Sequence, residues 1–255
     1  MARVISIVNQ KGGVGKTTTT VNICSIIAAR GKKALLIDID PQGNSSLGLG
    51  IDKKNIETGI YSVLIGDSTA DESLVKTAIE GLDVLPANIN LAGAEVELVN
   101  IENRETRLKD ALAEIKDRYD FVFIDCPPSL GLLTLNALTA SDSVLIPIQC
   151  EFYALDGLAM LLETVENVRE VLNPGLTIEG ALITMFDSRT SLSLQVVEEI
   201  KKKFKSRAYD TIIPRNVRLS EAPSFGTPIN LYDKHSKGAQ AYEKLCDEIL
   251  GVKRK

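Results

Sequence analysis

Short apolar runs alternate with longer amphipathic stretches from one end of this 255-residue chain to the other. The runs Ala34–Ile37 and Phe121–Ile124 are entirely apolar, which is typical of strands buried on both faces of a parallel sheet. This alternation predicts an α/β fold with a doubly wound, mostly parallel sheet flanked by helices. We expect strands at 3–9, 33–38, 82–86, 119–125, 143–148, 176–184 and 209–213, and helices at 16–30, 104–118, 155–172, 192–204 and 238–250. The Gly/Ser/Asn-rich segment 40–55 is expected to be a mobile loop.

The bulk composition is that of an ordinary globular chain. Hydrophobic residues make up 44% and charged residues 25%, and the length fits one domain over residues 1–255. No apolar run approaches the roughly 20 residues that span a bilayer, and the N-terminus shows no signal-peptide pattern. The four cysteines are scattered without metal-ligand spacing, so we expect reduced core residues and a cytoplasmic protein.

The segment Asn-Gln-Lys-Gly-Gly-Val-Gly-Lys-Thr-Thr at residues 9–18 lies between the first strand and the first helix. Its glycines allow backbone N–H groups to surround an anion, and the helix N-terminus points its positive dipole at the same place. Lys16 is placed to neutralise the β- and γ-phosphates and Thr17 to bind Mg²⁺. The pattern therefore predicts a P-loop NTPase, with nucleotide contacts from Lys11, Gly12, Gly13, Val14, Gly15, Lys16, Thr17 and Thr18.

Two further strand ends carry carboxylates. Asp38 and Asp40 end the second strand, and Asp125 follows four apolar residues. Ligands of a parallel sheet lie beyond the carboxyl ends of its strands, so these side chains are expected beside the P-loop. Asp125 fits a Walker B aspartate that binds Mg²⁺ directly or through water. Of Asp38 and Asp40, one carboxylate can hold the metal ion through water and the other can orient the attacking water. Asp40 is a candidate for both roles.

The P-loop departs from the usual pattern, because Gln10 stands where a glycine is common and Lys11 precedes the glycines. The form Lys-Gly-Gly-x-Gly-Lys-Thr-Thr is the deviant Walker A motif and resembles the ParA/MinD/nitrogenase-iron-protein group of ATPases. The sequence Asp-Pro-Gln-Gly-Asn at 40–44 resembles ParA/Soj-type chromosome-partitioning ATPases rather than MinD, and that likeness extends over essentially the whole chain.

The resemblance implies roles for individual residues. Lys11 reaches across a nucleotide-sandwich homodimer formed with ATP, and Asp40 positions the hydrolytic water, so Lys11, Lys16 and Asp40 form the catalytic set. Glu151 is expected to contact the nucleotide or Lys11 of the opposite subunit; its alternative role is a charge at a helix N-terminus. The loop 213–217 is expected to pack against adenine through Pro214 and Asn216, a plain turn being the alternative.

The resemblance also implies ATP-dependent, sequence-independent binding of double-stranded DNA, a nucleoid-associated location, and a ParB-type partner that stimulates a slow ATPase. Ten Lys/Arg and six Asp/Glu lie between residues 187 and 238, a net charge of +4 in a chain whose net charge is −5. Arg189 and Arg218 resemble family positions used for DNA. The further candidates are Lys201, Lys202, Lys203, Lys205, Arg207, Arg215, Lys234 and Lys237. For the lysines of the run 201–205, a solvated charged face is the alternative.

Two other functions compete with this interpretation. A MinD-like ATPase that positions cargo at a membrane surface would use a C-terminal amphipathic helix. The segment 242–250 has an acidic outer face and an apolar stripe that we expect to pack in the core, so no stable membrane binding is expected. A metabolic kinase would require an acceptor pocket, which no sequence feature specifies.

Overall fold

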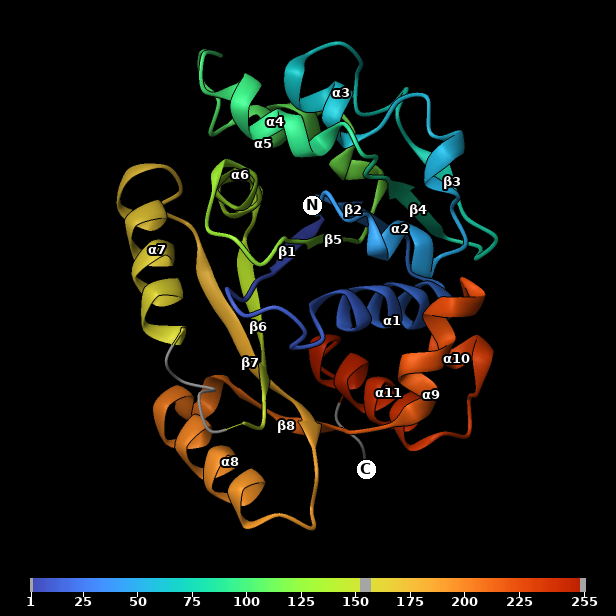
Figure 1. Cartoon of the computed structure of the whole chain (residues 1–255), viewed down its shortest axis with the longest axis vertical. Coiled ribbons are helices and arrows are strands. Elements are labelled where there is room, and N and C mark those ends of the chain that lie inside the picture. The colour runs from blue at the N-terminus through green and yellow to red at the C-terminus, as the bar shows by residue number, and fades with distance from the viewer. Residues whose placement is uncertain (1, 152–156, 253–255) are drawn as a thin grey trace.

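The computed structural model describes residues 2–151 and 157–252. An eight-stranded sheet with the order β3-β4-β2-β5-β1-β6-β7-β8 runs through the molecule (Figure 1). All neighbouring strands are parallel except β3 and β4. The strands are β1 Arg3–Ile7, β2 Ala34–Asp38, β3 Val75–Lys76, β4 Leu82–Leu85, β5 Phe121–Asp125, β6 Ser143–Gln149, β7 Thr177–Phe186 and β8 Ala208–Pro214.

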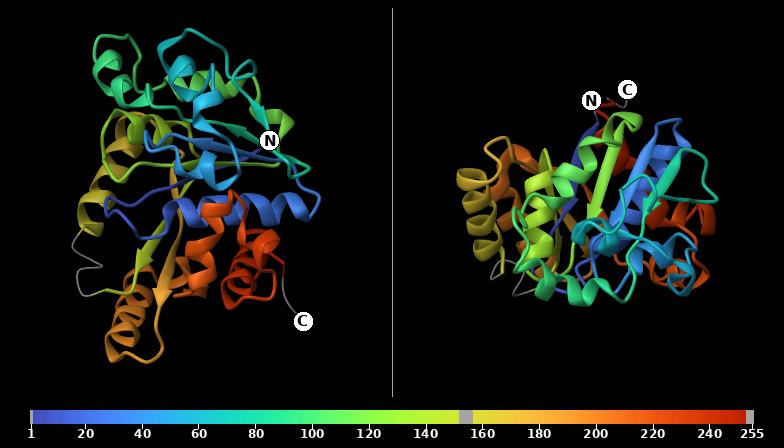
Figure 2. Two further views of the ribbon diagram at one scale, coloured as in Figure 1. Left: turned by 45° about the vertical axis from the view of Figure 1, so that its right-hand side comes forward. Right: turned by 90° about the horizontal axis from the view of Figure 1, so that it is seen from above.

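Helices cover both faces of the sheet, and Figure 2 shows the two layers from other directions. One face carries α3 Ile60–Ile65, α4 Leu91–Leu98, α5 Arg107–Ala113, α6 Leu132–Ala140, α7 Leu158–Val171 and α8 Ser191–Phe204. The other carries α1 Lys16–Ala29, α9 Val217–Glu221, α10 Ile229–Tyr232 and α11 Lys237–Ile249. The short helix α2 Asn44–Gly48 follows β2 and contacts α1. The doubly wound arrangement predicted from the sequence is confirmed.

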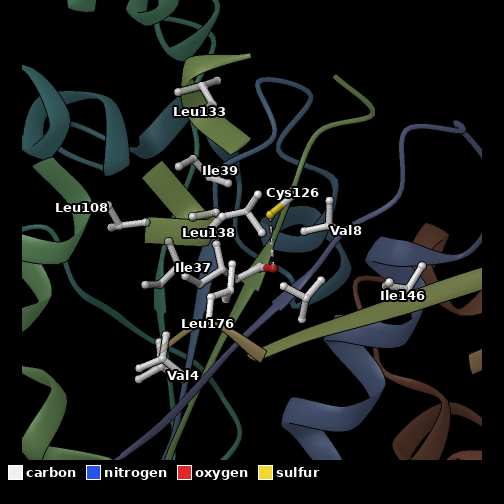
Figure 3. Close-up of a cluster of buried hydrophobic side chains, with 14 of the residues drawn as sticks. Val4, Val8, Ile37, Ile39, Leu108, Cys126, Leu133, Leu138, Ile146 and Leu176 are labelled. Atoms are coloured by element: carbon white, nitrogen blue, oxygen red, sulfur yellow. Dashed lines mark hydrogen bonds between the residues drawn. The ribbon is translucent and has the colours of Figure 1, made fainter. Parts of the chain in front are cut away.

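Alternating side chains of the central strands fill two separate cores. In β1, Val4 belongs to the core beneath α3–α8 and Ile5 to the core beneath α1 and α11. In β2, Leu35 belongs to the first of these cores and Leu36 to the second. Figure 3 shows part of the first core, with Val4 among its labelled residues. Because successive side chains of a strand point to opposite faces, a strand covered on both sides must be apolar throughout, which explains the uninterrupted apolar runs.

The seven predicted strands are confirmed, with ends that differ by one or two residues. The helix expected at 104–118 is instead α5 followed by a 3₁₀ turn at Lys116–Arg118. The helix expected at 155–172 is α7, and residues 155 and 156 of that prediction lie outside the described residues. The two-residue strand β3 and the helices α2, α3, α4, α6, α9 and α10 were not predicted.

The segment 40–55, expected as a loop, contains regular structure. It forms α2 and a 3₁₀ turn at Lys53–Asn55. Ser45 and Ser46 are fully buried in α2, and Ser46 donates its hydroxyl to Asp38 at the end of β2. A single turn of helix leaves little apolar periodicity in the sequence, so this element had no signal beyond its small polar residues.

The described residues contain no helix long and apolar enough to cross a membrane. The four cysteines, Cys24, Cys126, Cys150 and Cys246, are buried with free thiols, as their apolar surroundings in the sequence predict.

Candidate functional site

The loop between β1 and α1 is braced at its first residue. The side-chain amide of Asn9 donates to the Pro147 carbonyl (2.7 Å), and its oxygen accepts the Lys11 N–H (2.9 Å). Gly13 and Gly15 adopt φ values of 73° and 89°, which lie in the left-handed region that disfavours residues with a Cβ. Helix α1 then begins at Lys16. The sequence prediction of a tight glycine loop that opens a helix is thus met in detail.

Lys16 is buried at the start of α1, with 6% of its surface exposed. Its Nζ lies 3.3 Å from the Lys11 carbonyl oxygen. Burial lowers the pKa of Lys16, and the nearby Asp125 and Asp40 act in the opposite direction. Because the Lys16 ammonium is removed from water, an anion placed in the loop would stabilise it.

Asp125 and Asp38 are register partners on adjacent parallel strands, at the carboxyl ends of β5 and β2. Both are fully buried. Burial, and next the charge of Asp38, raise the pKa of Asp125 to about 8, while Thr17 and Lys16 oppose the shift. Thr20 donates its hydroxyl to Asp125 Oδ1 at 3.3 Å, and Oδ2 is buried with no hydrogen-bond partner among the described residues. Two neighbouring buried carboxylates favour a cation between them and the phosphates.

Asp38 and Asp40, which the sequence left as alternatives, occupy different positions. Asp38 accepts from the Ser46 N–H (2.8 Å) and hydroxyl (2.7 Å), and its other oxygen accepts the Asp40 N–H (3.3 Å). Asp40 is 8% exposed and accepts the Gln42 N–H at 2.9 Å through one oxygen. Both oxygens of Asp38 therefore brace the turn, which leaves Asp40 as the better placed group for water or substrate.

Among residues 2–151 and 157–252, no three His, Cys, Asp or Glu side chains gather into a metal-ligand set. Mg²⁺ does not need one, because it usually binds one or two protein carboxylates and completes its octahedron with phosphate oxygens and water. The partnerless Asp125 Oδ2 and the neighbouring Thr17 hydroxyl fit that mode of binding.

A pocket of about 510 Å³ adjoins the N-terminal turn of α1. Gly15 and Thr18 line it from the P-loop and α1, and Pro214 and Asn216 lie in its wall together with the buried Tyr242. Asn216 Oδ1 caps α9 by accepting the Leu219 N–H. The structure therefore brings the two predicted adenine contacts to a pocket of suitable size next to the P-loop.

Lys11 and Glu151 meet in the same chain. The Lys11 Nζ lies 2.7 Å from Glu151 Oε2, and the two side chains are 38% and 47% exposed. The predicted contact of Glu151 with an opposite subunit stays a prediction, and the structure adds a pairing that sequence reasoning did not foresee.

The ten candidate DNA-binding residues are all exposed, and they divide into groups. Arg189, Arg215 and Arg218 follow the carboxyl ends of β7 and β8, whereas Lys201–Arg207 lies at the end of α8 and leads into β8. At about 3.3 Å per residue, β8 separates the two groups by roughly 20 Å. Lys234 and Lys237 lie near the start of α11.

Arg189 and Arg218 are both engaged by carboxylates of their own chain. Arg189 makes two hydrogen bonds to Asp187 (2.8 and 2.6 Å), and Arg218 contacts Glu221 (2.8 Å). A phosphate that binds either arginine would have to replace these partly exposed carboxylates.

Three site residues escaped sequence reasoning. Thr20 lies three positions after Thr17, on the same face of α1, so helical spacing could have found it. Ser46 reaches Asp38 from eight positions away, and Thr184 reaches the P-loop from 170 positions away; only the fold shows these contacts.

Comparison with known proteins adds independent observations. A family described as AAA domain matches residues 2–178. The chain is 58% identical to the sporulation initiation inhibitor protein Soj of Bacillus subtilis, over 98% of each protein. It is 55% identical to the chromosome partitioning protein ParA of Myxococcus xanthus, over 98% of this chain and 88% of that protein. The solved structure of cobyrinic acid a,c-diamide synthase from Mycobacterium smegmatis with bound ADP and magnesium superposes with a TM-score of 0.86 and 41% identity, over 98% of this chain and 94% of the other.

Proposed function

This chain belongs to the ParA/Soj family of chromosome-partitioning ATPases, and we propose that it is an ATP-driven switch. In this proposal, a single ATPase domain dimerises with ATP, binds DNA without sequence preference and drives partitioning. The observation that carries the proposal is the arrangement of Lys16, Asp40 and Asp125 around a left-handed glycine loop. Every member of this set lies at the same edge of the sheet, where nucleotides bind in α/β folds.

The residues divide the chemistry among themselves. The N–H groups of the loop and Lys16 bind the β- and γ-phosphates and stabilise the charge that develops there. Thr17 and Asp125 would hold Mg²⁺, which would supply further neutralisation of the phosphate oxygens. Asp40 orients the attacking water, and its position is fixed by its hydrogen bonds to the backbone of Gln42 and to Asp38.

Lys11 and Gly12 support an ATP-dependent dimer. The Lys11 side chain is 38% exposed and pairs with the exposed carboxylate of Glu151, so it can leave that partner at low energetic cost. Among the described residues, no atom lies within 4 Å of a Cβ built on Gly12, which supports the use of this face by a second copy of the chain. In the proposed dimer, Lys11 contacts the nucleotide of the other subunit.

The proposed partners are double-stranded DNA and a ParB-type DNA-binding protein, with cytoplasmic, nucleoid-associated localisation. Exposed arginines and lysines provide weak, salt-dependent contacts to phosphates. Two copies in a dimer double these contacts, which makes strong binding conditional on ATP. The relatives named Soj and ParA support this assignment.

The alternative of a membrane-surface ATPase receives less support. In α11, Tyr242, Leu245 and Ile249 are buried against the core. An apolar stripe that is already packed inside the protein is not available to lie in a bilayer surface. We therefore expect no co-sedimentation with anionic liposomes in either nucleotide state.

The dimer test uses light scattering after size-exclusion chromatography, together with phosphate release. We expect the wild type to be a dimer with Mg·ATP and a monomer with ADP. Lys11→Ala should remain monomeric with ATP, and Lys32→Ala, which removes an exposed lysine beyond the far end of α1, should behave as the wild type. Absence of ATP hydrolysis by the wild type, or a full dimer of Lys11→Ala, would contradict the proposal.

A further inference from the structure

Thr184, near the end of β7, connects that strand to the phosphate-binding loop. Its hydroxyl donates a hydrogen bond to the Val14 carbonyl oxygen at 2.8 Å, across 170 positions of sequence. Both residues are buried, with 2% and 1% of their surfaces exposed. We propose that Thr184 is a positioning residue for the nucleotide: it turns the Val14 carbonyl away from the phosphates. This inference rests on the proposed ATP-binding function.

The argument follows from the geometry of one peptide group. In a trans peptide, the carbonyl of Val14 and the N–H of Gly15 point in opposite directions, and the described residues contain no cis peptide bond. A carbonyl held toward Thr184 therefore directs the Gly15 N–H to the other side. A loop that binds anions needs its N–H groups inward, because an inward carbonyl would repel a phosphate oxygen.

The backbone at Gly15 makes this control useful. Gly15 has φ of 89°, and glycine crosses between backbone conformations more easily than any other residue. A peptide that ends at such a glycine can rotate unless a neighbouring group fixes it. The Thr184 hydroxyl supplies that constraint from a rigid strand rather than from within the flexible loop.

Thr184 is itself held independently of its hydroxyl. Its backbone carbonyl accepts the Cys150 N–H at 3.2 Å, and its Cγ2 methyl lies 3.8 Å from the position of a Cβ built on Gly15. Replacing only the hydroxyl should therefore leave the strand in place. The residue also lines the candidate nucleotide pocket, so its effect should appear in nucleotide affinity.

Two substitutions separate positioning from packing. Thr184→Val keeps the branched shape and removes the hydrogen bond to Val14, whereas Thr184→Ser keeps the hydroxyl and removes the methyl group. Thr211→Val serves as the matched control, since Thr211 is also buried on a strand, in β8, and its backbone N–H pairs with Glu248 rather than with the P-loop. The dissociation constants of Mg·ATP and Mg·ADP are measured by titration calorimetry, with the melting temperature of the nucleotide-free chain in parallel.

We expect Thr184→Val to bind both nucleotides about tenfold more weakly, because the loss of the bond leaves a buried carbonyl free to turn. The dissociation constants of Thr184→Ser should be within about twofold of the wild-type values, because its hydroxyl retains the hydrogen bond to the Val14 carbonyl. Wild-type affinity in Thr184→Val, or equal weakening in both variants, would overturn the positioning role. A wild type that binds neither nucleotide would overturn the proposed function as well, so the two failures are distinguishable.

Discussion

The Nζ atom of Lys11 lies 2.7 Å from Oε2 of Glu151 in the same chain, 140 positions away in sequence. The pair joins the P-loop to the end of β6, and both side chains are substantially exposed. Exposed ion pairs contribute only about 0–1 kcal/mol and are screened by salt. The single chain thus holds Lys11 in an ion pair of defined geometry that contributes little to the free energy of folding.

Replacing Glu151 should therefore affect assembly more than stability. With Glu151→Gln, Lys11 loses its charged partner, and we expect dimerisation at a lower ATP concentration with the free energy of unfolding within about 0.5 kcal/mol of the wild type. Light scattering against ATP concentration and urea unfolding measure the two effects. The control is Glu166→Gln, which removes an equally exposed ion pair on α7. A dimer that requires more ATP would instead show that Glu151 supports the closed state.

The buried carboxylates predict a pH-dependent stability in the absence of Mg²⁺ and nucleotide. The pKa of Asp125 is raised to about 8 by burial and by Asp38, against about 3.9 for an unfolded aspartate. Between these values the folded chain binds the extra proton, so the free energy of unfolding falls as pH rises. Asp125→Asn removes this penalty and should be more stable than the wild type at pH 8, by an amount on the order of a few kcal/mol.

The difference should shrink steadily toward pH 5, as urea unfolding at several pH values can show. The same variant should lose Mg²⁺-dependent nucleotide binding, because it replaces the carboxylate whose Oδ2 has no hydrogen-bond partner in the described part of the chain. A stability difference that does not change with pH would rule out the perturbed titration of Asp125.

Gly12 and Gly13 are adjacent but should respond differently to a side chain. A Cβ placed on Gly12 would meet no atom of residues 2–151 and 157–252 within 4 Å, and the φ of Gly12 is not positive, whereas Gly13 has φ of 73°. Gly12→Val should fold with nearly wild-type stability and fail to dimerise with ATP, while Gly13→Val should lose about 1–3 kcal/mol through backbone strain. Melting temperatures and light scattering test both; normal dimerisation of Gly12→Val would place the dimer interface elsewhere.

Arg189 and Arg218 should contribute separately to DNA affinity. Each is exposed and paired with carboxylates of its own chain, so a DNA phosphate must replace those partners. Arg189→Ala and Arg218→Ala should each weaken DNA binding and reduce the slope of log K against log salt by about 1. Lys202→Ala tests the second basic group, at the far end of β8; a larger loss there would assign the DNA contact to α8.

The sequence predicted the seven longer strands and the glycine loop that opens α1 because both depend on local patterns. Buried parallel strands must be apolar, and a glycine loop before a helix has few structural interpretations. Asp40 and Asp125 could be placed beside Lys16 because parallel strands present their carboxyl ends at one edge.

What the sequence did not reveal depends on specific side-chain contacts, two of which join distant segments. Helix α2 is one turn long and is fixed by the bond from Ser46 to Asp38. Thr184 acts on Val14 from 170 positions away, and the pairing of Lys11 with Glu151 requires β1 and β6 to be neighbours. No periodicity within either partner encodes such relationships.

DNA co-sedimentation tests the central claim most directly, with ADP, with Mg·ATP, and with Mg·ATP for Asp40→Ala, each at low and high salt. Asp40→Ala should hydrolyse ATP at least about 100-fold more slowly, because the attacking water loses its orienting carboxylate. We expect DNA binding with ATP and not with ADP, persistence of that binding in Asp40→Ala, and its loss at high salt. Equal binding of DNA in both nucleotide states, or none in either, would contradict an ATP-controlled DNA switch.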